Sequence, residues 1–452
     1  MDWTGYLNAE RLRPSKRETK NDPRNEFESD FGRINFSPAI RRMHDKTQVF
    51  PLTADDNIHS RLTHSMEVMS IGHSLGLGIC ENKEFCEKIN RDENSLIREI
   101  PTLLKNACLV HDIGNPPFGH FGETVIKTFF NDFFNDPKFT LSLNDLEKQD
   151  FTLFDGNAQG LRVLTKLQVL SDPYGLNLTL GTLGTYIKYP NSGIIDKKIL
   201  SQSKRGVFQS ELEYFKIIAG KCGLENGEIY KRHPLAFLME AADSICYLVM
   251  DIEDGFNKGW YTYSDIKDFL KDVEGVPAKC EYLEKEYSGY GSEIACVVNL
   301  RIHLIRNFVE LARNNFIKNI DLICSGDYHH ELIKDDPSGL AEKLNNFCKK
   351  RIFPKREIQS LELTGHSVLS GLLKYFTDFI FGGNKDYKKR AVGLISDSII
   401  RAAYLENNLV ENDDFDKLSD YYKLRVIVDY ISGMTDQFAL DQYQKLSGQK
   451  II

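Results

Sequence analysis

Two histidines and two aspartates lie in helical sequence patterns that would bring their side chains together. His111 and Asp112 are adjacent at the end of an apolar run, and the Gly-Asn-Pro-Pro that follows ends the helix there. Because neighbouring helical residues point about 100° apart, the two side chains reach one ion only near a helix end or a distortion. The pair therefore indicates a metal site at the end of a helix.

His64 and Asp243 extend this set from two other stretches of apolar periodicity. His64 continues a stripe with Val68 and Leu75, so it should point into the core. Asp243 lies in a similar stripe, and a buried aspartate charge is costly unless a cation or a donor compensates it. Two imidazoles and two carboxylates suit an octahedral divalent ion such as Mn, Fe or Mg, with positions left for water and substrate. They lack the thiolates of a structural zinc site.

A second histidine and acid pair follows the Pro-Pro break, where Phe118 to Glu123 opens another helix. If that helix begins near His120, Glu123 lies one turn further on the same face. The carboxylate can then hold the imidazole tautomer and favour its protonated form, as a general acid beside a metal requires. Hydrolysis beside a metal leaves an anionic leaving group that needs a proton. The sequence leaves open whether His120 gives that proton or positions the attacking water.

The order of these residues resembles the HD superfamily of metal-dependent phosphohydrolases. The longer words RLTHS, HDIGNPPFGHFGE and EAAD are similar to those of the deoxyguanosine triphosphate triphosphohydrolase family, and family-like words run from about residue 24 to 438. The resemblance implies a metal-dependent hydrolase that cuts a dNTP, with dGTP the favoured substrate, at the α-phosphorus. The products would be a deoxynucleoside and inorganic tripolyphosphate.

The resemblance also implies substrate contacts. Gln48, in the word RRMHDKTQV, and Asp251 would share the deoxyribose 3′-hydroxyl, while Tyr247 would pack where a 2′-hydroxyl would clash. Asp243, Tyr247, Asp251 and Asp254 recur on one helix face, and Asp254 is expected to be structural. The remaining expected contacts, mainly to the triphosphate, are Lys188, Tyr189, Asn157 and Arg425. Base recognition is expected from the C-terminal part, with Glu357 and Glu362 as candidates.

Composition restricts the class of protein. With 452 residues and 41% apolar content, the chain can bury a sizeable core in two or three domains. The net charge of −8 argues against nonspecific binding to nucleic acid or membranes as its main role. Nine cysteines without a C-x-x-C pair indicate reduced thiols. Without a signal peptide or an apolar span, a soluble cytoplasmic protein is expected.

The expected elements are helical. Apolar periodicity predicts core helices over 61–79 and 100–111, a helix from near His120 toward Phe134, and a long helix over 292–326. Short alternating runs between Gly193 and Gly206 predict a small β excursion. The whole is expected to be all-α. An N-terminal segment 1–23 precedes an HD core over 24–260, and a C-terminal helical part over 261–452 contributes to substrate binding and oligomer contacts.

The resemblance further implies a homo-oligomer, often a hexamer in this family, with a dNTP or single-stranded DNA as regulator. The nearly balanced charge of residues 1–50 gives no independent support for a DNA site. Two alternatives stay open. One is an HD phosphohydrolase acting on a nucleoside monophosphate or guanosine tetraphosphate, against which Gln48, Tyr247 and Asp251 speak. The other is a non-enzymatic nucleotide sensor, which should lack a ligand or the His120-Glu123 pair. His59 is expected on the surface.

Overall fold

A computed structural model describes residues 2–13, 22–48, 52, 58–168, 172–289, 291–411 and 413–450. Within these ranges the chain is helical, as predicted, and the only strands are the short β1 Glu225–Asn226 and β2 Ile229–Tyr230, which pair antiparallel. The all-α fold class is therefore confirmed. Among the described residues, none of the helices combines the length and apolar character needed to cross a bilayer.

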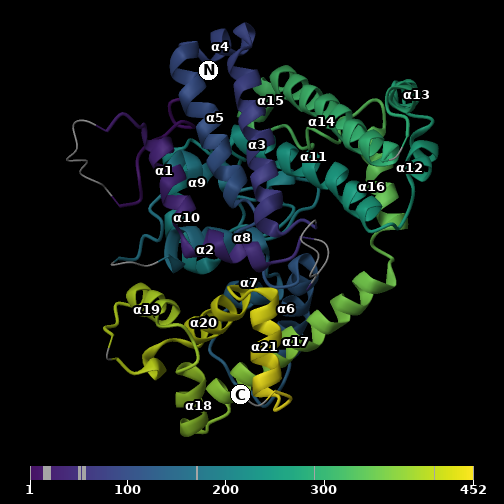
Figure 1. The fold of residues 1–452 in the computed structure, drawn as a ribbon. Helices are drawn as coiled ribbons and strands as arrows, with labels where there is room; N and C mark the ends of the chain where they lie inside the picture. The colour runs from purple at the N-terminus through teal and green to yellow at the C-terminus, as the bar shows by residue number, and fades with distance from the viewer. Residues whose placement is uncertain are drawn as a thin grey trace.

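Three helices form the centre of the molecule: α3 Arg61–Cys80, α5 Glu93–Val110 and α11 Pro234–Asn257. Helices α3 and α5 lie side by side, and α11 packs against α3 (Figure 1). Gly76 permits the close approach of α3 to α5, because a Cβ at this position would stand 2.7 Å from Pro101 Cα. The three predicted metal-bearing segments thus belong to adjoining helices.

The other helices surround this centre in two groups. The first group is α1 Glu26–Asn35, α2 Pro38–Arg42, α4 Lys83–Ile89, α9 Leu180–Tyr186, α10 Leu212–Lys221, α12 Tyr263–Leu270, α13 Val276–Glu286, α14 Ser292–Lys318, α15 Ile320–Ser325 and α16 Leu340–Arg351. The second is α6 Gly119–Phe133, α7 Asp145–Thr152, α17 Arg356–Phe381, α18 Lys385–Val392, α19 Asp397–Glu406, α20 Asp420–Ser432 and α21 Asp436–Leu446. Helix α8 Gly156–Arg162 lies between them. Short turns are η1 Met43–Asp45, η2 Val163–Leu167, η3 Leu200–Gln202, η4 Gln209–Glu211 and η5 Phe415–Lys417.

The buried apolar side chains form two clusters that correspond to these groups. The first runs from Trp3 to Ile358 and includes the three central helices, and the second joins α6 to α17, α20 and α21. Helix α17 spans both clusters and links the two groups (Figure 1). Helix α6, which carries His120, is therefore held mainly by C-terminal helices. The domain division at residue 260 stays a prediction, while the packing puts residues 261–358 in the first cluster.

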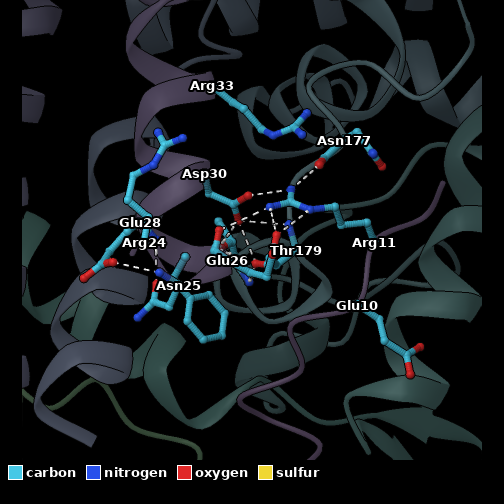
Figure 2. Close-up of polar contacts among 12 residues, drawn as sticks. Glu10, Arg11, Arg24, Asn25, Glu26, Glu28, Asp30, Arg33, Asn177 and Thr179 are labelled. Atoms are coloured by element: carbon cyan, nitrogen blue, oxygen red, sulfur yellow. Dashed lines mark hydrogen bonds and ion pairs between the residues drawn. The ribbon is translucent and has the colours of Figure 1, made fainter. Parts of the chain in front are cut away.

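The beginning of the chain is fixed to the first group by a buried ion pair. Arg11 Nη1 donates to Asp30 Oδ1 of α1 at 2.6 Å and to the Asn177 carbonyl, and Asp30 Oδ2 accepts from the Thr179 amide at 2.9 Å and hydroxyl at 2.7 Å (Figure 2). Because every charge in this cluster has a partner, its burial is compensated. The contacts attach residues 2–13 to α1 and to the start of α9.

Two expected elements differ from the structure. Residues 193–206 contain no strand. The side-chain amide of Asn191 contacts three backbone carbonyls of this segment, which folds it into a loop around Asn191. The helix expected over 292–326 is divided into α14 and α15 at Asn319. There the side-chain amide of Asn319 donates to the Asn315 carbonyl, at 2.8 Å, near the end of the helix.

Candidate active site

Side chains from α3, from α11 and from the end of α5 lie close together. The ligand atoms of His64, His111 and Asp243 lie within 4.8 Å of one another. Asp243 Oδ1 is 3.2 Å from His64 Nε2 and 3.4 Å from His111 Nε2. Asp112 Oδ1 lies 3.6 Å from His111 Nε2. The structure thus brings together all four residues predicted to bind the metal.

The donor set fits a cation. His111 Nδ1 donates to the Cys108 carbonyl at 2.8 Å, so Nε2 is the nitrogen turned toward the carboxylates. This Nε2 is buried and makes no hydrogen bond within the described part of the chain. Burial lowers the pKa of His111, but Asp112 and Asp243 outweigh it and raise this pKa to about 9. The carboxylates therefore favour positive charge at this point, as a divalent ion would supply.

Two residues that the sequence analysis missed hold Asp112 in place. Arg61 Nη1 pairs with Asp112 Oδ2, and Asn115 Nδ2 donates to Asp112 Oδ1 at 2.7 Å. Burial raises the pKa of Asp112, but Arg61 and His111 lower it to about 2, so the carboxylate is ionised at neutral pH. The position of Arg61, one turn before His64, was the only signal in the sequence.

The pair of His120 and Glu123 lies on one face of α6, as predicted. Glu123 Oε2 is 3.6 Å from His120 Nδ1, and the interaction with this carboxylate raises the pKa of His120. Glu123 is buried, and its Oε1 accepts from the Gly156 amide at 2.9 Å. A Cβ at Gly156 would stand 2.8 Å from Glu123 Oε1, so this close contact requires glycine. The imidazole of His120 is 77% exposed and faces the pocket.

A pocket of about 500 Å³ opens beside these residues. The residues predicted to contact substrate that line this pocket are Gln48, Asn157, Lys188, Tyr189, Tyr247 and Asp251. The predicted metal and catalytic residues that line it are His111, Asp112, Asp243 and His120. It is also lined by residues outside the predicted set, among them Thr47, Lys204, Glu240, Asn345 and Phe353, and by the base candidate Glu362. A pocket of this size accommodates a small-molecule ligand such as a nucleotide.

One wall of the pocket is cationic. Lys188 Nζ lies 3.3 Å from Glu240 Oε1 and 4.0 Å from Asp243 Oδ2, and Lys204 Nζ lies 3.2 Å from Asp155 Oδ2. The side chain of Asn157 bonds the same Asp155, at 2.7 Å. The two lysines place positive charge next to the metal-binding point, where a phosphate chain would need it. The sequence analysis did not identify Lys204.

Two buried polar side chains, Gln48 and Asp251, also line the pocket. Gln48 Oε1 is buried and accepts no hydrogen bond from the described residues. Asp251 is only 7% exposed, and its pKa is raised to about 8 by burial and by Asp254, with His59 opposing. Buried polar groups in native proteins normally have partners, so unpartnered groups that face a pocket indicate a ligand. Tyr247 lies on the same helix face as Asp251 and also lines the pocket.

His59 was expected on the surface and is instead half-buried. Its Nδ1 bonds Asp254 at 2.8 Å and its Nε2 bonds Glu67 at 3.1 Å. Burial lowers the pKa of His59, but these two hydrogen bonds outweigh it and raise the pKa to about 10. Since the partner Asp254 comes from α11, far away in sequence, periodicity around His59 could not reveal the contact. Asp254 is structural, as predicted.

Arg425 was expected to bind phosphate, but the structure does not bring it to the pocket. Its side chain is fully buried in α20, where Nη2 donates to Gln159 Oε1 at 2.7 Å and to Asp429 Oδ1 at 3.1 Å. The guanidinium carbon lies 4.1 Å from the centre of the Phe208 ring. These partners already satisfy the charge, so Arg425 is part of the second cluster's buried ion network.

Comparison with known proteins agrees with this site. The HD domain family model matches residues 61–151, which include the metal-bearing ends of α3 and α5, and the phosphohydrolase-associated domain model matches residues 401–445. A deoxyguanosinetriphosphate triphosphohydrolase-like protein of Listeria innocua is 37% identical, covering 99% of this chain and all of its own. A protein of the same name from Synechocystis sp. is 33% identical over 99% of both chains.

A relative from Klebsiella pneumoniae, named deoxyguanosinetriphosphate triphosphohydrolase, is 33% identical over 96% of both chains. These matches extend over nearly the full length, so they include both the metal-binding helices and the C-terminal helices that hold α6. The chain belongs to the deoxyguanosinetriphosphate triphosphohydrolase family of HD-domain hydrolases.

Proposed function

We propose that the protein hydrolyses a dNTP, with dGTP preferred, to deoxynucleoside and inorganic tripolyphosphate. The observation that carries this proposal is that one pocket is lined by His111, Asp112 and Asp243 of the metal-binding set, by the His120 imidazole, by Asp251 and by Gln48, whose Oε1 has no partner among the described residues. Such a pocket offers a cation, a proton and hydrogen-bond partners for a sugar. The names of the relatives from Listeria and Klebsiella support the substrate.

His64, His111, Asp112 and Asp243 would hold a divalent ion, for which Mn, Mg and Fe all suit the donor set. When bound, the ion would lower the pKa of a water molecule and neutralise phosphate oxygens. Lys188 and Lys204 would bind the negative charge of the triphosphate. Water oxygen would bond to the α-phosphorus as the bond to the 5′-oxygen breaks. Because His120 Nδ1 faces Glu123, His120 Nε2 is the atom free to protonate that oxygen.

Product analysis separates this function from its alternatives. The protein is incubated with Mn and each dNTP in turn, with a nucleoside monophosphate and with guanosine tetraphosphate, and the products are resolved by chromatography. Tripolyphosphate released from dGTP supports the proposal. Orthophosphate or pyrophosphate released from the other substrates indicates a different HD phosphohydrolase, and no product from any substrate indicates a nucleotide sensor.

Tyr247→Ala should relax discrimination against ribonucleotides. Removing the ring opens space where a 2′-hydroxyl would otherwise clash, so the ratio of kcat/KM for dGTP over GTP should fall by roughly 10 to 100-fold. Parallel kinetics with the two nucleotides measure this ratio. Tyr247→Phe is the matched control, because it keeps the ring and should keep the discrimination. An unchanged ratio in Tyr247→Ala would remove Tyr247 from sugar selection.

Glu362→Gln should weaken the preference for guanine. Glu362 faces the pocket from α17, and burial raises its pKa. A carboxylate accepts from both N1–H and the 2-amino group of guanine, whereas adenine presents an acceptor at N1. The preference for dGTP over dATP should therefore fall by roughly 10 to 100-fold, equivalent to about 1–3 kcal/mol. Glu357→Gln, an exposed change in the first turn of the same helix, should leave the preference unaltered.

The prediction of a cytoplasmic protein follows from its cysteines and from the absence of an apolar span in the sequence, whereas a homo-oligomer, often a hexamer in this family, and a regulatory dNTP or single-stranded DNA follow from the family resemblance. We retain them as part of the proposal. Light scattering of the purified protein, alone and with each dNTP or an oligonucleotide, measures the size of the oligomer and whether these ligands change it.

A further inference from the structure

Asp436, in the first turn of α21, receives donors from two distant segments. Its side chain is buried, with the residue 2% exposed. Oδ2 accepts from the Thr47 amide at 3.0 Å and also from the Thr47 hydroxyl, and Oδ1 accepts from the Phe118 amide at 3.0 Å. One carboxylate of the C-terminal helices therefore joins the segment that carries Gln48 to the segment that starts α6.

The first of these segments carries the proposed sugar contact. Thr47 directly precedes Gln48, and its carbonyl accepts from Arg61 Nε at 3.2 Å. Arg61 in turn pairs with the metal-binding residue Asp112. Thr47 is thus held at its amide by Asp436 and at its carbonyl by Arg61, which fixes the backbone from which the Gln48 side chain projects.

The second segment carries the proposed proton donor. Phe118 has a φ of +61°, a left-handed conformation that is unfavourable for a residue with a side chain and persists only when its surroundings impose it. Its amide is held by Asp436, and its ring belongs to the second apolar cluster. His120 follows two residues later, so the conformation of Phe118 sets the direction in which α6 begins.

Lys46 forms a separate connection between the same parts of the molecule. Its Nζ is buried and donates to the Asn115 carbonyl at 2.7 Å and to the Ser432 carbonyl of α20 at 2.8 Å. These two hydrogen bonds do not involve Asp436, although the Asp436 carboxylate also attracts the Lys46 charge. The bonds should therefore keep the C-terminal helices attached to the metal-binding loop when the Asp436 carboxylate is altered. A change at Asp436 can then alter alignment without separating the two groups of helices.

We propose that Asp436 is a positioning residue that aligns the sugar contact Gln48 with the proton donor His120. The proposal rests on the proposed function, because that function assigns both roles. Asp436 does not itself line the pocket or belong to the ligand cluster, but its hydrogen-bond partners Thr47 and Phe118 both line the pocket. It acts through the backbone of Thr47 and Phe118. Its loss should therefore affect recognition of the 3′-hydroxyl and the rate of hydrolysis together.

Asp436→Asn tests this assignment. The amide keeps one accepting oxygen, but its nitrogen cannot accept, so either the Thr47 or the Phe118 amide loses its partner. We expect kcat for dGTP to fall by about 10 to 100-fold, as for other residues that orient catalytic groups. The ratio of kcat/KM for dGTP over 2′,3′-dideoxyguanosine triphosphate should also fall toward one, while the number of bound Mn ions stays unchanged.

Asp150→Asn is the matched control for a merely structural loss. Asp150 is also a buried carboxylate that accepts from a backbone amide, of Gln209 at 2.7 Å, and from a hydroxyl, of Tyr421 at 2.7 Å, but it does not line the pocket. It differs from Asp436 in that it also pairs with Arg205 Nη2 at 2.9 Å. This variant should have a lower thermal midpoint, and its ratio of kcat/KM for dGTP over the dideoxy substrate should stay at the wild-type value. If Asp436→Asn keeps that ratio, or if Asp150→Asn lowers it equally, the positioning role is overturned.

Hydrogen exchange separates this result from a failure of the proposed function. If the wild-type protein releases no tripolyphosphate from dGTP, the proposed function fails. The role of Asp436 is then tested only by the hydrogen-exchange rates of the Thr47 and Phe118 amides. Faster exchange of these amides in Asp436→Asn than in Asp150→Asn supports the assignment. Equal exchange in the two variants overturns it.

Discussion

Asp243→Asn is expected to abolish metal binding and to lower turnover by more than about 10²–10³-fold, the loss caused by removing a single electrostatic stabiliser. Asp243 Oδ1 lies closest to the centre of the ligand set, 3.2 Å from His64 Nε2 and 3.4 Å from His111 Nε2. The substitution keeps the shape of the side chain but removes its negative charge. The neutral amide can also turn its donor group toward the cation, so the remaining three ligands should not retain the ion.

Three measurements test this prediction: the metal content after dialysis, the turnover of dGTP, and the thermal midpoint with and without Mn. An ion that binds only the folded protein stabilises it by about 2.7 kcal/mol at a free concentration of one hundred times its Kd. Wild-type protein should show this gain, and Asp243→Asn should not. In a chelator the two proteins should unfold at similar temperatures, because the substitution changes no apolar packing.

Asp254→Asn is the matched control, since it makes the same chemical change on the same face of α11. Asp254 is buried but bonds His59 rather than the metal-binding histidines. This variant should keep its Mn-dependent stabilisation, although it loses the negative charge that faces His59. A full complement of bound ion in Asp243→Asn would contradict the ligand assignment, as would an equal loss of the ion in Asp254→Asn.

The parts of this site that could be predicted are those that local sequence determines. Gly-Asn-Pro-Pro ends α5 at Val110 and leaves His111 as its C-cap, so these neighbouring residues alone place the His-Asp pair at a helix end. Apolar periodicity likewise placed Asp243 and Asp251 on one face of α11. The helical fold class follows from the same periodicity, repeated along most of the chain.

The residues that were missed act through contacts between distant segments. Arg61 reaches Asp112 across 51 positions, and Asp436 reaches Thr47 across 389. Lys204 follows a loop whose course depends on the buried Asn191 amide. No periodicity in one segment reports such partners. The same limit explains why Arg425 was expected to bind phosphate. The sequence shows an arginine close to a family-like motif, but it does not show that this side chain is buried beside Asp429.

His120→Ala is expected to keep the metal and to lower kcat by about 10²–10⁴-fold, the usual contribution of general acid or base catalysis. His120 lies outside the ligand cluster, on α6, and its exposed ring contributes little to the core. Metal content and turnover, measured on the same preparation, test both halves of the prediction. His303→Ala on α14 is the control, because that histidine does not line the pocket, and full activity should remain. Equal activity in His120→Ala would exclude His120 from the mechanism.

The pH dependence of kcat should identify the protonated form of His120 as the active one. Glu123 raises the pKa of His120, so the proton is fully present at low pH and is lost as the pH rises through this elevated pKa. Activity should therefore decline on the alkaline side. Glu123→Gln removes the charge that holds the proton, so the decline should begin at lower pH, with the metal still bound. An alkaline limb at the same pH in both proteins would mean that His120 positions water rather than donating a proton.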